Sequence, residues 1–411
     1  MFSVRRLFTN PLLRALQHRP FVLLWIGQII SRLGDSLYRI ALAWWVLEQT
    51  GSAAAMGTVL IFAFTPQLLF LLVGGLAVDR FPRVRVMLAS DLLSGSMVAL
   101  VAALAFTGRL EIWHIYVMSG IFGFVSAFFE PAYAAAIPDL MPAELLPSAN
   151  SLTSLSIQLV GIVGPAVGAL LVGIGGTSTA FAINALSFFI SAACLLGLPA
   201  LPAHAAATGS SGVLGDVREG LATVWHSPWL WITIAVFSLV NVTQSGPQAV
   251  ALPFLVRETH GAGVNALGLI YGCTSLGAVV TAVWLGRSVK LRNRGPWAYG
   301  AALAGGLMTM MLGLPIGLWG IALASFVGGA SLTLFSLIWT NTLQELVPRE
   351  RLGRVISIDL LGSFVLLPIG YGIAGWATDR LGAPLVFVIG GLSTVVMLSL
   401  ALLHPAIRGL D

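Results

Sequence analysis

Long, continuously apolar segments alternate with short polar connections along most of the chain. A helix that spans a bilayer needs about 20 apolar residues, and twelve segments reach that length. The predicted spans are 20–46, 53–78, 86–107, 112–137, 151–174, 178–198, 229–254, 264–285, 296–314, 316–340, 355–377 and 384–404. Their residues do not alternate in polarity, as the strands of a membrane barrel would. The pattern therefore predicts an all-α membrane protein with twelve transmembrane helices.

One connection is much longer than the others. Residues 199–228 begin rich in Pro, Ala, Gly and Ser and end in an amphipathic stretch. They separate six predicted spans from six others. We therefore expect an N-terminal six-helix bundle over 1–198, a cytoplasmic linker on the membrane surface over 199–228, and a C-terminal six-helix bundle over 229–411.

A short motif recurs in the two predicted halves. Residues 139–146 read DLMPAELL, and residues 345–352, which begin 206 positions later, read ELVPRERL. Each copy joins the fourth and fifth spans of its half, on the same side of the membrane. The halves are therefore predicted to be parallel repeats. Parallel six-span repeats are one plan of secondary transporters, whose substrate site lies between the halves near the midplane of the bilayer.

Composition and charge agree with a membrane-embedded chain. Of the 411 residues, 57% are hydrophobic and 9% are charged, whereas soluble domains have about 25% charged residues. The mean hydropathy is +0.94. Sixteen of the 21 Lys and Arg residues fall on the side that holds both termini, which predicts cytoplasmic termini. This bias accounts for the net charge of +5, so no nucleic-acid partner is expected.

Motifs for enzymatic chemistry are missing from the sequence. There is no GxxxxGK[ST] phosphate loop, no G-x-S-x-G elbow and no Cys–His metal spacing. We therefore expect no enzymatic activity, no catalytic residues, no metal site and no cofactor. ATP is not expected to drive the protein directly.

The loop after the second predicted span carries an acid followed by several arginines. Residues 75–85 read GLAVDRFPRVR and resemble the signature loop of the major facilitator superfamily, with Pro82 where that loop usually has Gly. The resemblance implies a cytoplasmic latch whose ion pairs hold the outward-facing state. The alternative is plain positive-inside anchoring. The latch residues would be Gly75, Asp79, Arg80, Arg83 and Asp91.

Asp91 is expected to be a structural partner of the latch arginines rather than a proton site. The corresponding loop of the second half, 286–294, keeps the basic charge but lacks the acid. Any latch there is expected to be weaker.

The fifth predicted span places small residues on successive helical turns. Its motif consists of Gly161, Gly164, Pro165 and Gly168. Glycines at this spacing let helices approach closely, and a proline kinks the span. The pattern resembles the fifth-span motif of exporters that exchange a substrate for protons. Generic close packing is the alternative.

The first predicted span carries charge on one helix face. Arg32, Asp35 and Arg39 are spaced three and four residues apart. An acid near mid-span should face a partner or a wet cavity, because its burial in lipid is costly. With the Ala-Asn-Ser-Leu start of the fifth span, 149–152, this span resembles the macrolide-efflux, mycobacterial multidrug-efflux and enterobactin-exporter branch of the superfamily. The fourth span lacks the Arg that many proton-coupled members have, so Arg32 and Arg39 are candidates for its role.

Two acids are candidates for proton coupling. We expect Asp35 in the first span and Glu130 in the fourth span to carry protons or to sense cations. The alternatives are a permanent salt bridge between Asp35 and its neighbouring arginines, and an interfacial anchor at Glu130. An interfacial role is expected for Asp359, just inside the eleventh span.

The resemblance also implies that spans 1, 4, 7 and 10 surround the substrate cavity. Aromatic walls with a few polar groups suit amphipathic, often cationic, small molecules. The candidate cavity residues are Tyr38, Phe129, Tyr133, Asn241, Gln244, Gln248, Trp339 and Asn341.

The sequence thus predicts a monomeric, multidrug-type secondary exporter in a bacterial inner membrane. It would move hydrophobic or amphipathic small molecules in exchange for protons by alternating access, with the small molecule, protons and the lipid bilayer as its partners. A siderophore or lipid exporter of the same fold, an uncoupled facilitator and a non-transporting membrane scaffold are the alternatives.

Overall fold

The computed structural model describes residues 11–199, 213–286 and 293–411. Within these ranges the chain is helical, with no strand. The chain divides into two compact units. Unit 1 consists of Met1–Glu48 and Phe62–Ala207, and unit 2 consists of Gln49–Ile61 and Thr208–Asp411.

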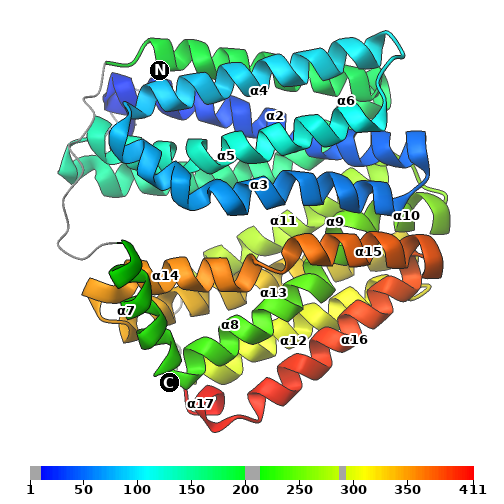
Figure 1. The fold of residues 1–411 in the computed structure, drawn as a ribbon. Helices are drawn as coiled ribbons and strands as arrows, with labels where there is room; N and C mark the ends of the chain where they lie inside the picture. The colour runs from blue at the N-terminus through cyan, green and yellow to red at the C-terminus, as the bar shows by residue number, and fades with distance from the viewer. Residues whose placement is uncertain (1–10, 200–212, 287–292) are drawn as a thin grey trace, which may run out of the picture. The chain divides into compact units, whose positions relative to one another are not determined.

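Long helices make up unit 1 (Figure 1). They are α2 (Arg19–Thr50), α3 (Ala53–Arg80), α4 (Arg83–Phe106), α5 (Ile112–Leu140) and α6 (Leu146–Leu196), with the short 3-10 turns η1 (Pro11–Gln17) and η2 (Ala143–Leu145). The end of α2 and the start of α3, within Gln49–Ile61, belong to unit 2. Helix α4 packs against α5 and α6. Helix α6 contains two predicted spans, which are joined at Gly176 with φ 75° and ψ 173°. Only glycine adopts this backbone conformation readily, so Gly176 turns the chain between the fifth and sixth spans.

Unit 2 is built from shorter and more interrupted helices (Figure 1). They are α7 (Val213–Trp225), α8 (Pro228–Val240), η3 (Asn241–Ser245), α9 (Gly246–Val250), α10 (Leu252–Phe254), η4 (Leu255–Thr259), α11 (Val264–Gly286), α12 (Arg294–Leu312), α13 (Gly317–Leu346), α14 (Arg349–Phe364), α15 (Leu367–Leu381), α16 (Ala383–Leu402) and α17 (Pro405–Arg408). The seventh predicted span, 229–254, contains the π-helical turn η3, and a second π-helical turn, η4, directly follows it. The eleventh span is broken between α14 and α15, where Pro368 follows the break.

Each of the twelve predicted spans coincides with helical backbone. Nine stretches within the described ranges are long and apolar enough to cross a bilayer, and Ala143–Leu196 is one such stretch although it holds two spans. The prediction of an all-α, multi-pass membrane protein is therefore confirmed.

The two units use the same close helix crossing. In unit 1 a Cβ at Gly123 of α5 would overlap the carbonyl of Ala63 in α3, and in unit 2 a Cβ at Gly329 of α13 would overlap the carbonyl of Thr274 in α11. Position 329 follows position 123 by 206 residues, which is the offset of the sequence repeat. Glycine lets the two backbones touch at each crossing. The internal repeat thus extends from a short motif to the packing of the helices.

The second part of the predicted linker is helical. Helix α7 packs on α8 and α14 within unit 2. Its Glu219 forms an ion pair with Arg351, whose Nε lies 3.0 Å from Oε1, and a second ion pair with Arg354. Residues 200–212 lie outside the described ranges. These ion pairs attach α7 to the start of α14.

The start of α3 is capped within unit 2 by a carboxylate from α15. The backbone amides of Ala53 and Ala54 donate to Asp379 at 2.6 and 3.1 Å, and the Ser52 hydroxyl donates at 2.7 Å. The first amides of a helix have no partner inside the helix and carry partial positive charge. The Asp379 carboxylate supplies these amides with both an acceptor and a negative charge.

Candidate functional site

Unit 2 encloses a cavity of about 400 Å³ that is lined by residues of α8 to α14. The helices are opened there by η3, because a π-helical turn widens the backbone and redirects side chains. Asn241, Gln244 and Ser245 of this turn all line the cavity. The volume lies in the range of sites that bind small organic molecules.

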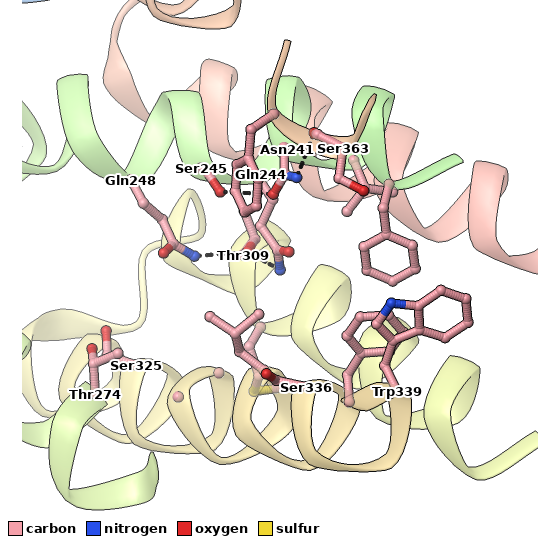
Figure 2. Close-up of a pocket in the computed structure, with 18 of the residues that line it drawn as sticks. Asn241, Gln244, Ser245, Gln248, Thr274, Thr309, Ser325, Ser336, Trp339 and Ser363 are labelled. Carbon is pink, nitrogen blue, oxygen red and sulfur yellow. Dashed lines mark hydrogen bonds between the residues drawn. The ribbon is translucent and has the colours of Figure 1, made fainter. Parts of the chain in front are cut away.

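One wall of the cavity is polar and hydrogen-bonded (Figure 2). The Gln244 and Gln248 amides both donate to the Thr309 hydroxyl, at 3.2 and 3.4 Å. The Asn241 amide donates to the carbonyl of Ser363 at 2.9 Å. These bonds fix the orientation of the amides, and the remaining hydrogen-bonding groups of the amides face the cavity.

Another part of the lining is aromatic. Phe237 and Phe335 stack with their ring centroids 4.0 Å apart, and Trp339 lies parallel to Phe335 at 6.3 Å. The Trp339 indole N–H donates to Oδ2 of Asp359 at 3.0 Å. The Asp359 side chain is 9% exposed and belongs to the cavity lining. The structure thus contradicts the expected interfacial role of Asp359 and places this acid beside an aromatic wall.

Of the predicted cavity residues, Asn241, Gln244, Gln248 and Trp339 line this cavity. Asn341 does not line it, and its side chain is exposed. Sequence reasoning missed Thr309, Phe335 and Asp359 as lining residues. An acid inside an apolar segment was the available signal for Asp359, whereas a threonine or phenylalanine in a membrane helix carries none.

The predicted cavity residues of unit 1 are not among the residues that line this cavity. Tyr38 is buried, with its hydroxyl 3.7 Å from the Met118 sulfur and its ring against Phe181. Phe129 and Tyr133 are stacked on α5, with their ring centroids 6.4 Å apart. Their role in binding a substrate stays a prediction.

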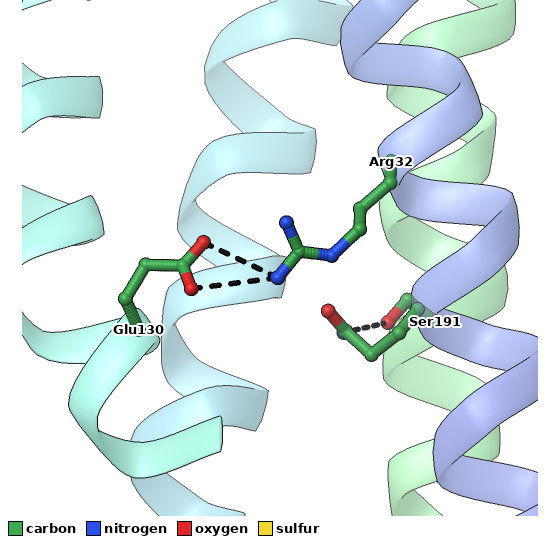
Figure 3. A network of polar contacts seen from close by, with 4 residues as sticks. Arg32, Glu130 and Ser191 are labelled. Atoms are coloured by element: carbon green, nitrogen blue, oxygen red, sulfur yellow. Dashed lines mark hydrogen bonds and ion pairs between the residues drawn. The ribbon is translucent and has the colours of Figure 1, made fainter. Parts of the chain in front are cut away.

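A charged network crosses from α2 to α5 in unit 1. Arg32 Nη2 lies 3.5 and 3.4 Å from the two Glu130 carboxylate oxygens (Figure 3). The Arg32 guanidinium also lies over the Tyr133 ring, 5.5 Å from its centroid. The two charged side chains are 28% and 51% exposed. A pair this exposed contributes about 1 kcal/mol or less, so it can break and re-form readily.

Two acids lie deeper in unit 1. Asp91 of α4 is 1% exposed, beside Ser191 of α6, and Asp35 of α2 lies beside Asn184. Within the described part of the chain, Asp35 Oδ1 and Asp91 Oδ2 are buried without a hydrogen-bond partner. No ion pair within 4 Å joins Asp35 to either neighbouring arginine in that part. Arg32 pairs with Glu130 instead, and Arg39 is exposed.

The latch region is arranged differently from the prediction. Arg83 forms an ion pair with Asp139 at the end of α5 and donates to the Ala135 carbonyl at 2.9 Å. Asp91 is not its partner, because it lies buried two turns farther along α4. In unit 2, Arg294 pairs with Glu345 at 2.5 Å. The first acid of each repeat copy therefore binds an arginine at the start of a neighbouring helix, which the sequence did not reveal.

The other predicted latch residues, where their side chains are described, make no ion pair in the described part of the chain. The Arg80 side chain is exposed, and a Cβ at Gly75 would meet open space. The side chain of Asp79 lies outside what the structure describes. Its role in a latch stays a prediction.

The fifth-span motif makes close contacts with α2. A Cβ at Gly164 would overlap the Ser36 side chain, and one at Gly168 would lie 3.1 Å from Leu37 Cα. Pro165 lies inside α6 between these two glycines. The motif therefore brings α6 against the helix that carries Arg32 and Asp35.

Comparison with known families gives one match that covers most of the chain. The sequence model described as Major Facilitator Superfamily matches residues 24–361 and 234–408.

Among curated proteins, the chain is similar to the multidrug efflux pump Tap of Mycolicibacterium fortuitum. The two are 27% identical over 405 residues, which cover 95% of this chain and 97% of the pump. This chain is also 24% identical over 395 residues to macrolide efflux protein A of Streptococcus pyogenes, and the match covers 95% of this chain and 97% of that protein.

Solved structures share the fold at lower sequence identity. The nucleoside transporter NupG matches with a TM-score of 0.72 and 12% identity, over 93% of this chain and 98% of its own. A bacterial homologue of the iron transporter ferroportin, in an inward-facing state, matches with a TM-score of 0.69 and 15% identity, over 94% and 99%.

Proposed function

Because the chain belongs to the Major Facilitator Superfamily, we propose that it is a secondary active exporter of hydrophobic or amphipathic small molecules. The similarity to proteins named as multidrug and macrolide efflux pumps supports the direction of transport. The observation that carries the proposal is the cavity of about 400 Å³ in unit 2. Its aromatic faces and few fixed amides would hold an apolar molecule and orient its polar groups.

The charged network of unit 1 supports coupling to protons. Protonation of Glu130 would remove the charge that holds Arg32. Asp35 lies three residues after Arg32 on the same helix face and has a buried oxygen without a partner. Arg32 could then exchange Glu130 for Asp35, and loss of the proton would reverse the exchange. Proton binding would thereby bias two conformations of the carrier, as alternating access requires.

Placement in the bilayer completes the proposal. The basic residues concentrated beside the termini support a bacterial inner-membrane protein with both termini in the cytoplasm. A monomer is proposed, because each half of the repeat supplies a complete bundle. Under this orientation, export runs from the side that holds the termini to the opposite side.

Inside-out membrane vesicles test the proposal. Vesicles that contain the protein should accumulate ethidium when acidified inside, and a protonophore should abolish the accumulation. Asp35→Asn should remove uphill transport while the protein remains inserted. The matched control is Glu258→Gln, which removes one exposed negative charge of unit 2 outside the cavity lining.

Each alternative gives a different result in this assay. Ethidium accumulation that depends on neither the pH gradient nor the membrane voltage would refute proton antiport. Uphill export by Asp35→Asn would show that Asp35 is structural. Downhill flux alone would indicate an uncoupled facilitator, and an absence of flux for all solutes would indicate a scaffold. An exporter of siderophores or lipids would move those molecules and not ethidium.

A further inference from the structure

Asp359 differs from the other polar residues of the cavity because it can carry a full charge. It lies on α14, is 9% exposed, and is the one acidic or basic side chain among the described residues that line the cavity. The remaining polar lining consists of amides, hydroxyls and one indole N–H. The electrostatic character of the cavity therefore depends on this single carboxylate.

The protein supplies no counter-charge for Asp359 in its described part. Arg351 and Arg354 of the same helix pair with Glu219 of α7. No ion pair to Asp359 occurs within 4 Å among the described residues. Burying a carboxylate without a partner is costly, so a buried charge is normally paired or neutralised. The missing partner leaves room for a cation that enters with the substrate.

The surroundings of Asp359 determine which kind of cation would fit. Trp339 holds the carboxylate through its indole N–H and stands beside Phe335. Trp229 packs edge-on against Trp339, with ring centroids 5.5 Å apart. Aromatic faces attract organic cations through the ring quadrupole. A small metal ion needs several ligands, and the described residues contain no group of three acids, histidines or cysteines that could hold one.

We propose that Asp359 determines specificity for amphipathic organic cations by pairing with their positive charge, while Trp339 orients its carboxylate. This inference rests on the proposed function, because it assumes that the cavity binds the transported molecule. The apolar body of the cation would contact Phe335 and Phe237, and its polar groups would reach the amides of Gln244 and Gln248. The proposal narrows the substrate class from amphipathic molecules in general to cationic ones.

Two probes of similar shape but different charge distinguish the effect of ligand charge on binding from the effect of ligand shape. Tetraphenylphosphonium carries a permanent positive charge and cannot exchange a proton, and triphenylphosphine oxide is neutral. Both would be radiolabelled, and their equilibrium binding to the full-length protein in lipid nanodiscs would be measured. Variants are Asp359→Asn, which keeps the shape, Asp359→Glu, which restores the charge, and Glu258→Gln as the charge control outside the cavity. Gel filtration and thermal unfolding would establish that each variant is folded.

The expected pattern is specific to the cation. Asp359→Asn should weaken tetraphenylphosphonium binding at least about 30-fold, the usual consequence of removing one partner from a buried charge pair. It should leave triphenylphosphine oxide binding unchanged. Asp359→Glu should recover most of the cation affinity, and Glu258→Gln should affect neither probe.

Other results would overturn the inference. Unchanged cation binding by Asp359→Asn would show that Asp359 is not the counter-charge, although the cavity could still be the substrate site. An equal loss of both probes in a folded Asp359→Asn protein would indicate that the residue shapes the cavity. If the unmodified protein bound neither probe, the assignment of the cavity as the substrate site would fail as well.

Discussion

Replacing Gly123 by alanine tests whether the crossing of α3 and α5 depends on direct backbone contact. A Cβ at this position would overlap the Ala63 carbonyl and lie 3.3 Å from Ala63 Cα. These are backbone atoms, so the two helices would have to separate. Overpacking of this kind costs about 1–3 kcal/mol. Alanine regains about 1 kcal/mol through its higher helix propensity, so we expect a net loss of up to about 2 kcal/mol in the free energy of unfolding.

Gly120→Ala is the matched control, one turn earlier on the same helix. A Cβ there would lie 3.8 Å from the Phe62 ring, which is an ordinary contact. This variant should keep only the gain of about 1 kcal/mol from helix propensity. The two variants make the same chemical change, and their unfolding free energies should differ by about 1–3 kcal/mol.

The assay is reversible unfolding of the purified protein in mixed detergent micelles, followed by circular dichroism. The equivalent pair in unit 2, Gly329→Ala and Gly328→Ala, repeats the comparison, because only position 329 faces a backbone carbonyl and position 328 has the Met308 Cβ at 3.8 Å. Equal stability of Gly123→Ala and Gly120→Ala would refute the argument that backbone contact fixes this crossing.

Two further predictions concern charged contacts of unit 2. Asp379→Asn should lower the free energy of unfolding by about 1–2 kcal/mol, because the first amides of α3 lose an ionised acceptor. The same unfolding assay measures it, and a loss no larger than that of Glu258→Gln would contradict the cap. Glu219→Gln should change stability by less than about 1 kcal/mol but speed amide hydrogen exchange across α7 at low salt. An equal effect at high salt would argue against the ion pairs with α14.

The helices could be predicted from the sequence because the length of an apolar run sets the length of a spanning helix. The main irregularities could not. The π-helical turn at Asn241–Ser245 and the break after α14 lie inside predicted spans, and the length of a span marks neither position. The turn at Gly176, in contrast, lies in the predicted connection between the spans 151–174 and 178–198, although only its backbone angles distinguish this glycine from the other glycines of the chain.

Side-chain partners were harder to predict than helices. Asp91 follows Arg83 by eight residues and was the predicted partner of the latch arginines. However, eight residues of helix extend about 12 Å, which takes Asp91 away from the end of α4 and into the bundle. The actual partner, Asp139, is distant in sequence and close in space. In contrast, Gln244 and Trp339 were found because a glutamine and a tryptophan stand out in apolar spans.

The repeat explains why one unit contains an ion pair where the other contains a cavity. Helices α5 and α13 correspond at an offset of 206 residues, fixed by Gly123 with Gly329 and by Asp139 with Glu345. At this offset Glu130 corresponds to Ser336. Glu130 extends to Arg32, whereas Ser336 lines the cavity.

The aromatic residue that follows three positions after Glu130 and Ser336 also differs between the two units. Tyr133 of α5 corresponds to Trp339 of α13. The Tyr133 ring lies under the Arg32 guanidinium, while Trp339 holds the Asp359 carboxylate at the cavity wall. A shorter side chain at Ser336 leaves space that Glu130 and its partner fill in unit 1. The same helix face thus supports a charge network in one copy and a binding cavity in the other, so we expect coupling variants of unit 1 and specificity variants of unit 2 to have separable effects on transport.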